Sequence, residues 1–477
     1  MDLLDHNSAP TQIVEPGRTT KWKVGGCAPT IALIVVLLIG LVVGAVCFRA
    51  SSIHRQAIAE VKTEIAQIRT AVEPITPDDM YAFHCVPGGV YDTTDLWLTA
   101  IALYDKTRDE DCELLPMIGN EPDFERLAPD HPSSLMPVAE RYLANHADVY
   151  EAVRRAAAAK GEVRFPLVFE DGIEIMIPHV TPMRLLARLF WFRSRMALAR
   201  GDAHESAESL LTALECGEAL RQEPLLVSQL VRGVIFRETC RQLEVLVESE
   251  AIADTDLRRI QDRMANIEFS TGLRLALLGE RSTNLLAFYQ IAQSNGSADL
   301  PAVRNLDGDP IRPKDCAAYL RAMRQVLAAV NSPGEVAADE GGRIRDAVAC
   351  LRQVDGYLGA EWNYITEVSI ASLDRSMSSF VQSYITRDTT IAGIAARRYH
   401  LRNSTPPRSL EVLVPDFIDV VPTDPYSQGK LLLLRKSKTL AVFSIGENGI
   451  DDQSLFTAND GDDIGFVFDL PDGQRNH

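Results

Sequence analysis

The pattern of apolar and polar positions sets one early segment apart from the rest of the chain. No residue from Val24 to Phe48 carries a charge, and within 31–48 the sequence IALIVVLLIGLVVGAVCF has Ile, Leu, Val or Phe at thirteen positions. A helix of about 20 apolar residues spans the ~30 Å hydrocarbon layer of a bilayer. The apolar region of a cleaved signal peptide is only about 7–15 residues long. The pattern therefore predicts a retained transmembrane helix over 24–48, with the lipid bilayer as its first partner.

The charges that flank this helix give almost no bias in orientation. Three basic residues precede it and three follow it: Arg18, Lys21 and Lys23, then Arg49, Arg55 and Lys62. A short tail with a large domain behind it favours the tail in the cytoplasm. We therefore expect a single-pass protein of the cell inner membrane, with residues 1–23 cytoplasmic and the C-terminal domain extracytoplasmic, in the periplasm.

A juxtamembrane amphipathic helix is predicted over 49–78. Its apolar positions follow the alternating 3,4 spacing of one helical seam: Ile58, Val61, Ile65, Ile68 and Val72. Prolines 74 and 77 end the pattern. The seam could form a homodimer through 58–72, or it could pack on the protein's own domain. About two heptads are short for a stable coiled coil, which favours the second alternative.

The sequence predicts a helical domain over residues 79–385. Turn-forming residues dominate 80–133, around one helix near Asp95–Tyr104, and helices resume near Ser134. In the sequence VFEDGIEIMIP, Asp171-Gly172 lies between two apolar runs, which predicts a β-hairpin. Later helices are expected at 254–266, 270–293, 312–331, 342–357 and 361–385.

The strongest helical periodicity covers 181–250 and predicts three helices. Gly201-Asp202 interrupts the first two, and the sequence LLVSQLVRGVIFRETCRQLEVLVE supplies the third. Small residues at the helix contact followed by Gly-Asp at the turn resemble a tetratricopeptide-type helical hairpin, over about one and a half repeat lengths. A plain helical bundle is the alternative.

The last segment turns from helix to a proline-punctuated β pattern. A helix ends at Arg398-Tyr399, and prolines 407 and 415 bracket SLEVLV. The turn Pro422-Thr-Asp-Pro425 and the strand ending in Phe443-Ser-Ile-Gly446 follow. In this order, 390–465 resembles the C-terminal part of the major pseudopilin of type II secretion systems. The whole chain also resembles a class of bacterial single-pass membrane proteins.

Residue patterns in this segment, 386–477, agree with a small α+β module. Leu431–Arg435 and Thr439–Ser444 flank a short loop and predict a hairpin, while Ile464, Phe466 and Phe468 alternate on a third strand. Three strands covered by a helix at 388–402 can bury one apolar face. The pseudopilin processing signature, a Gly before a Phe-rich N-terminus with a Glu five residues in, is not found in residues 1–48.

The pseudopilin resemblance also implies a calcium site. Pseudopilins of this kind bind calcium in the loop after an S-x-G-x-D-G strand, and here Ser444–Gly449 reads SIGENG, with Asn448 in place of Asp. Carboxylate and carbonyl oxygens suit Ca²⁺, which takes about 6–8 oxygen ligands. The expected calcium ligands are Asn448, Asp451, Asp460 and Asp462. A solvated acidic loop is the alternative.

The net charge and the sequence motifs of the chain restrict the classes of function that it can have. The formal net charge of −18 argues against nucleic-acid binding, which needs a basic face. The eight cysteines include no C-x-x-C pair; Cys85–Cys112 and Cys316–Cys350 are the nearest candidates for disulfides, and small buried hydrophobes are the alternative. No P-loop, HExxH, GxSxG or GxGxxG motif with its required context is found, and no two histidines are spaced i, i+4.

The sequence thus predicts a mainly α protein with an N-terminal transmembrane helix, an extracytoplasmic helical bundle or repeat-like domain, and a C-terminal α+β module with a three-stranded antiparallel sheet. The expected function is a non-enzymatic scaffold that binds an envelope protein. A component of a secretion or pilus assembly and an unrecognised envelope hydrolase are the alternatives.

Overall fold

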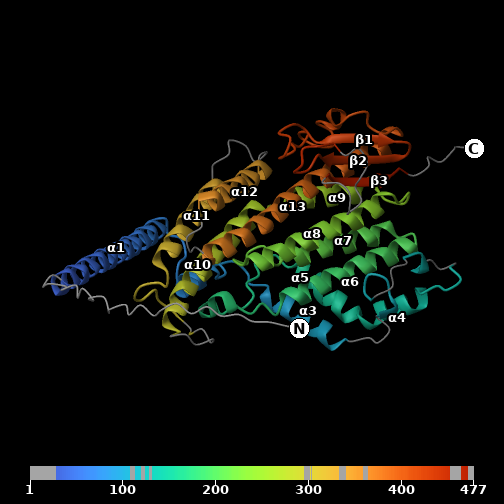
Figure 1. The fold of residues 1–477 in the computed structure, drawn as a ribbon. Coiled ribbons are helices and arrows are strands. Elements are labelled where there is room, and N and C mark those ends of the chain that lie inside the picture. Colours follow the sequence, from blue (N-terminus) through green and yellow to red (C-terminus); the bar gives the residue numbers. More distant parts are fainter. Residues whose placement is uncertain are drawn as a thin grey trace, which may run out of the picture. The chain divides into compact units, whose positions relative to one another are not determined.

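The structure is a computed structural model that describes residues 28–107, 113–119, 124–127, 131–294, 301, 303–331, 340–357, 364–451 and 463–470. The chain divides into two compact units, 1–56 and 57–477. As the sequence predicts, the protein is mainly helical, with an apolar N-terminal helix and a small C-terminal antiparallel sheet (Figure 1).

The first unit is built on α1, which spans Ala28–Thr70 and continues into the second unit. Every side chain from Ile31 to Phe48 is exposed, so no other described part of the first unit covers this apolar stretch. Among the described residues, α1 is the one helix that is both long enough and apolar enough to cross a membrane.

The second unit begins with the last part of α1, which packs on the helical domain. Val61 and Ile68 belong to the main hydrophobic core. Glu64 accepts a hydrogen bond from the guanidinium of Arg324 at 2.9 Å, which joins α1 to α11 (Pro313–Asn331). The apolar seam of the juxtamembrane helix is therefore used inside the chain, and Val72, just after the helix, is exposed.

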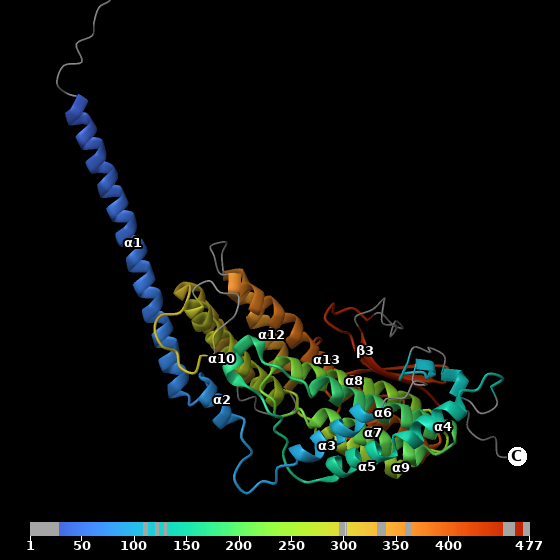
Figure 2. The same ribbon diagram turned by 90° about the horizontal axis from the view of Figure 1, so that it is seen from below.

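A layer of helices forms the centre of this unit. Contacts link α3 to α5 and α6, α5 to α7, and α6 to α7, so these helices lie side by side (Figure 2). The helices of the first half of this unit, including those of the layer, are α2 Pro77–Phe83, α3 Thr94–Lys106, the short 3₁₀ helix η2 Phe124–Leu127, α4 Met136–Asn145, α5 Ala147–Ala158, α6 Val180–Ala199, α7 Ala203–Glu218 and α8 Leu226–Val247.

The predicted break between the first two strong helices is confirmed. Gly201 has a φ of +76°, a conformation that glycine adopts without a Cβ penalty, and it separates α6 from α7. Asp202 caps α7 because its carboxylate accepts a hydrogen bond from the backbone N–H of Glu205 at 2.9 Å. Phe190, Trp191 and Phe192 are all buried.

The β-hairpin predicted around Asp171-Gly172 is wrong. The chain forms a 3₁₀ helix, η3 (Phe169–Glu174), instead. Gly172 takes a φ of +58°, as a hairpin turn would, but the flanking residues do not pair. Glu170 is held by the phenol of Tyr81 on α2, so the segment folds onto α2 and onto α10 (Ser270–Gln293) instead of onto itself.

The later helices follow the predicted positions closely, with one difference. They are α9 Asp254–Ala265, α10 Ser270–Gln293, α11, α12 Glu340–Tyr357 and α13 Tyr364–Asn403. The two helices expected at 361–385 and 388–402 form the single helix α13. It packs on α8, α9 and α12 as well as on the sheet, so the expected boundary at residue 386 falls inside one helix.

The C-terminal sheet has the order β1-β2-β3, all antiparallel, with β1 Leu432–Lys436, β2 Thr439–Ser444 and β3 Ile464–Asp469. The 3₁₀ helix η5, Leu410–Leu413, precedes it. One face of the sheet packs on α13 (Figure 1). A Cβ on Gly393 of α13 would lie 2.3 Å from the ring of Phe466, so the missing side chain allows this close packing.

The described cysteines are free thiols. Cys216, Cys240 and Cys316 are buried and Cys350 is half-buried, so the Cys316–Cys350 pairing is not formed. Burial keeps the thiols protonated, because it raises the pKa of Cys216, Cys240 and Cys316. The partner suggested for Cys85, Cys112, lies outside the described residues.

Candidate functional site

The predicted calcium loop is described only in part. Asn448 and Asp451 lie at the end of the turn after β2, whereas Asp460 and Asp462 lie outside the described residues. The side-chain oxygen of Asn448 accepts a hydrogen bond from the backbone N–H of Ile450 at 2.8 Å. The carboxamide thus closes a local turn, which is a common use of Asn at this kind of position.

Among the described residues, His204, Glu208 and Asp256 bring potential metal ligands within 4.8 Å of one another. His204 lies 3.0 Å from the Asp256 carboxylate, and this hydrogen bond raises the pKa of His204. The guanidinium of Arg259 forms an ion pair with Glu208 and lies 3.6 Å from Asp256. The imidazole of His204 and the guanidinium of Arg259 therefore already contact the two carboxylates, and these contacts join α7 to α9.

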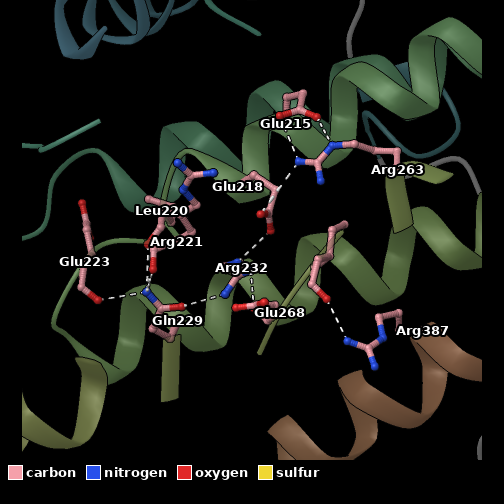
Figure 3. A network of polar contacts seen from close by, with 11 residues as sticks. Glu215, Glu218, Leu220, Arg221, Glu223, Gln229, Arg232, Arg263, Glu268 and Arg387 are labelled. Atoms are coloured by element: carbon pink, nitrogen blue, oxygen red, sulfur yellow. Dashed lines mark hydrogen bonds and ion pairs between the residues drawn. The ribbon is translucent and has the colours of Figure 1, made fainter. Parts of the chain in front are cut away.

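A buried polar network surrounds Arg232 on α8 (Figure 3). Its guanidinium donates hydrogen bonds to the carboxylate of Glu218 at 2.8 Å, to the side-chain oxygen of Gln229 at 3.3 Å and to the backbone carbonyl of Glu268 at 2.7 Å. Gln229 donates in turn to three backbone carbonyls, those of Leu220, Arg221 and Glu223. These bonds fix the turn from α7 to α8 against the start of α10.

The same network extends to α9. Arg263 donates two hydrogen bonds to Glu215, at 2.5 and 3.1 Å (Figure 3). Beside it lies a polar cavity of about 60 Å³, whose lining includes Trp97, Glu162, Glu215, Glu218 and Arg221. That volume suits a few waters, because small-molecule sites are typically about 300–1,000 Å³. The network is built to hold helices together.

A buried acid–base pair lies next to this turn. His179 Nε2 is 2.5 Å from the carboxylate of Glu223, and the two side chains are 3% and 1% exposed. The His179 ring stacks on Phe165 at 4.2 Å. His84 lies 3.1 Å from the carbonyl of Phe165, and burial lowers its pKa. A carboxylate–imidazole pair can act as a general base only where substrate reaches it, and here both side chains are closed off from solvent.

A second, smaller hydrophobic cluster lies apart from the main core. It is formed by Met80 of α2, Leu167 and Phe169 at η3, and Leu225 at the start of α8. Ile175 and Ile177 pack against it. Three segments that are distant in the sequence therefore meet here.

The segments that meet in this cluster, 77–84, 166–178 and 223–229, also carry exposed apolar side chains, and we name the exposed part of these segments the α2–η3 surface. Six apolar side chains of these segments are more than one-third exposed. They are Tyr81 (39% exposed), Phe83 (37%), Val168 (53%), Ile173 (56%), Met176 (74%) and Val227 (52%). Single exposed apolar residues are normal, but a group on one surface is typical of an interaction site.

Polar contacts beneath the surface hold η3 in place. The Tyr81 hydroxyl donates to the carboxylate of Glu170 at 2.6 Å, and this bond lowers the pKa of Glu170. Arg304 lies 2.8 Å from the same carboxylate. Gln290 of α10 donates to the Glu170 carbonyl at 3.0 Å, and a Cβ on Gly172 would lie 2.6 Å from its side-chain oxygen. The exposed apolar side chains are thus presented by a fixed backbone.

The segments 77–84, 166–178 and 223–229 contain no Lys or Arg. One cation from elsewhere in the chain, Arg304, lies against two of their carboxylates. Their carboxylates are Asp78, Asp79, Glu170, Asp171, Glu174 and Glu223. Glu170 and Glu223 are buried, while Asp78, Asp79 and Glu174 are exposed and Asp171 is half-buried. Arg304 pairs with Glu170 and lies 3.6 Å from Asp78.

Comparison with family models, with curated proteins and with solved structures finds no match to this chain. The arrangement of the site therefore carries the functional argument. Sequence reasoning missed the α2–η3 surface because it assigned the run VFEDGIEIMIP to a hairpin. The signal was present: a hairpin with one buried face alternates apolar and polar residues, whereas Ile173, Ile175, Met176 and Ile177 crowd both faces.

Proposed function

We propose that this protein is anchored in a membrane by α1 and that its helical domain works by binding another protein, without catalysis. The observation that carries the proposal is the combination of an uncovered apolar helix with exposed apolar side chains on α2 and around η3 in the domain that follows it in the sequence. The first suits lipid, and the second suits a protein partner. The anchor would keep the domain at the membrane surface, where an envelope partner is met at high local concentration.

The finer location belongs to the same proposal. The membrane is the cell inner membrane, with residues 1–23 in the cytoplasm and the domain in the periplasm. The order along the chain supports this orientation, because a short tail precedes the apolar helix and the large domain follows it. Free thiols at Cys216, Cys240 and Cys316 fit either compartment, because their burial protects them from oxidation.

Support for binding over catalysis comes from the buried polar groups. The side chains of His179 and Glu223 are closed to solvent, and the cavity beside Glu215 is small, at about 60 Å³. The residues of both sites make hydrogen bonds or ion pairs that join helices. These groups are used to specify the packing of α7, α8, α9 and α10.

Membrane fractionation tests the anchor, and protease protection tests the orientation. The full chain should stay in the membrane pellet after alkaline carbonate and dissolve in detergent. The domain should be cut by protease added to spheroplasts and be protected in intact cells. Recovery in the detergent-free supernatant would contradict the anchor, and protection in spheroplasts would contradict the periplasmic placement.

A component of a pseudopilin-like secretion or pilus assembly is the second candidate. The observation that favours it is the antiparallel sheet packed on the end of a long helix, α13, in the predicted order of elements. Intact-mass measurement separates the two candidates, because assembly of that kind requires N-terminal processing. A mass that includes residues 1–48 supports the scaffold. Titration calorimetry with calcium on the full chain, wild type against Asp451→Asn, tests the calcium loop.

A further inference from the structure

Three side chains between α7 and α9 offer metal ligands at one point. His204 and Glu208 lie four residues apart on α7, which places them on the same face of that helix. Asp256, in the first turn of α9, faces them, and the ligand atoms of all three lie within 4.8 Å of one another. We propose that these three residues, which we name the α7–α9 cluster, bind a divalent first-row transition-metal ion such as zinc. The inference goes beyond the proposed binding function and does not depend on it.

The spacing of the ligand atoms suits a small ion. Nδ1 of His204 lies 3.0 and 3.1 Å from the two carboxylate oxygens of Asp256. Zinc binds nitrogen and oxygen at about 2.0–2.2 Å with tetrahedral geometry, so two of its ligand atoms lie about 3.4 Å apart. An ion can therefore replace the proton between His204 and Asp256 after a small shift of the side chains, and Glu208 is close enough to supply a third ligand.

The type of ligand selects the class of metal. An imidazole nitrogen together with carboxylate oxygens suits zinc and its neighbours, whereas Mg²⁺ and Ca²⁺ take oxygen ligands. The side chain of His204 is 66% exposed, so an ion can enter from solvent and water can complete its coordination. The side chain of Asp256 is only 8% exposed, so this ligand is held in place by the packing of α9.

The charges of the cluster favour a cation. Arg259 forms an ion pair with Glu208 and lies 3.6 Å from Asp256. When the imidazole of His204 is neutral, this single guanidinium faces two carboxylates, so the cluster and Arg259 together carry one net negative charge. A metal ion adds positive charge at this point, and it competes with Arg259 for the same carboxylates.

A second pair between the same two helices shows what distinguishes His204. Arg263 of α9 donates hydrogen bonds to Glu215 of α7 at 2.5 and 3.1 Å. A guanidinium stays protonated and has no acceptor atom, so that pair can only hold the helices together. An imidazole offers a lone pair once its proton leaves. The end of the interface at His204 can therefore bind an ion as well as join α7 to α9.

The test uses the full chain in detergent, purified without a polyhistidine tag and freed of metal by dialysis against EDTA and then against metal-free buffer. Titration calorimetry with zinc chloride up to about 100 µM measures the dissociation constant, and magnesium chloride over the same range is the comparison. We expect zinc to bind and magnesium to give no comparable heat. His204→Ala should weaken zinc binding by about ten-fold or more, because changes even one shell away from a metal cost about 10–100-fold in affinity.

Matched variants separate the cluster from other histidines and carboxylates. His54→Ala removes an exposed histidine of α1, and Asp262→Asn removes an exposed carboxylate of α9, so both should leave the zinc affinity within about two-fold of wild type. Arg259→Gln removes the cation that competes for Glu208 and Asp256, and should tighten zinc binding by about three-fold or more. Thermal unfolding of each metal-free variant checks that it is folded.

Cobalt(II) in place of zinc supplies a second readout, because its visible absorption bands depend on the ligand atoms. The bands should be lost in His204→Ala and kept in His54→Ala. Two results would overturn the inference: a zinc affinity no greater than that for magnesium, and equal zinc affinity in wild type and His204→Ala. Neither result bears on membrane anchoring or on the α2–η3 surface, so failure here is distinguishable from failure of the proposed function.

Discussion

The carboxylate of Glu244 on α8 lies 2.9 Å from the backbone nitrogen of Val467 on β3 and accepts its N–H. One turn later, Glu248 accepts the N–H of Asp469 at 3.0 Å. Since β3 is an edge strand in the order β1-β2-β3, these glutamates occupy donors that would otherwise be free to pair with another strand. The helical domain therefore closes one edge of the sheet with side chains.

Glu244 should make stability depend on pH. Burial raises the pKa of its carboxyl to about 7, from 4.5. Between these values the folded state binds more protons than the unfolded state, so this group's contribution to the unfolding free energy falls as pH rises from 4.5 to 7. Glu244→Gln keeps an oxygen for the Val467 N–H and removes the charge. At pH 8 we expect the variant to be more stable than wild type by about 1–3 kcal/mol.

Thermal midpoints of the detergent-solubilised full chain between pH 5 and 8 measure this difference. The wild type and the Glu244→Gln variant should diverge as pH rises. Parallel curves for the two proteins would show that the glutamate is not protonated in the folded state.

His84 should act in the opposite direction. Its ring is buried beside Phe165, and desolvation lowers its pKa below the usual 6.5. The unfolded state then binds the proton more readily, so stability is lost as pH falls from 6.5 toward the lower folded pKa. His84→Gln keeps a donor for the Phe165 carbonyl, and should reduce the loss of thermal stability between pH 7 and 5. An unchanged acid limb in the variant would refute this assignment.

The turn that carries Glu223 and Leu225 depends on a glycine in the facing helix. A Cβ on Gly279 of α10 would lie 1.6 Å from the carbonyl oxygen of Pro224, a backbone atom that cannot rotate away. Gly279→Ala should therefore destabilise the protein by about 3 kcal/mol or more. The control is Gly429→Ala, where the nearest atom would be 3.4 Å away and the expected change is within about 0.5 kcal/mol. Chemical denaturation compares the two, and similar midpoints would contradict the close approach.

The stability that is lost when an arginine is removed should depend on how deeply that arginine is buried, as two arginines on the consecutive helices α8 and α9 show. Removing Arg232 leaves the carboxylate of Glu218, whose side chain is only 10% exposed, without its nearest cation, and breaking a buried pair costs about 3–5 kcal/mol. Arg258 is exposed and 3.9 Å from Asp262, so Arg258→Ala should change stability by no more than about 0.5 kcal/mol. Urea unfolding measures both variants. An Arg232→Ala protein as stable as Arg258→Ala would show that the network in Figure 3 does not hold the α7–α8 turn.

The sequence predicted the elements well where local chemistry decides them. Gly201-Asp202 marks the α6–α7 turn because glycine takes positive φ and Asp caps the next helix, and alternation at Ile464, Phe466 and Phe468 places β3. These signals lie within a few residues of the structure that they specify.

The sites could not be predicted in the same way because distant residues create them. Arg232 in LVRGVIF looks like a residue of a polar helix face, and only Glu218 and the Glu268 carbonyl, from other segments, explain its burial. The segment that was predicted to be a hairpin forms η3, and its Glu170 accepts a hydrogen bond from Tyr81, almost 90 residues earlier in the chain. The α2–η3 surface follows from that contact, and no single stretch of sequence contains it.

The most direct test of an anchored protein that acts by binding is photo-crosslinking in intact cells, with a photoreactive amino acid at position 173 of the membrane-inserted chain. The account predicts a discrete adduct with another protein from position 173 and none from the matched exposed position 420. No adduct at position 173, or the same adducts from both positions, would contradict it.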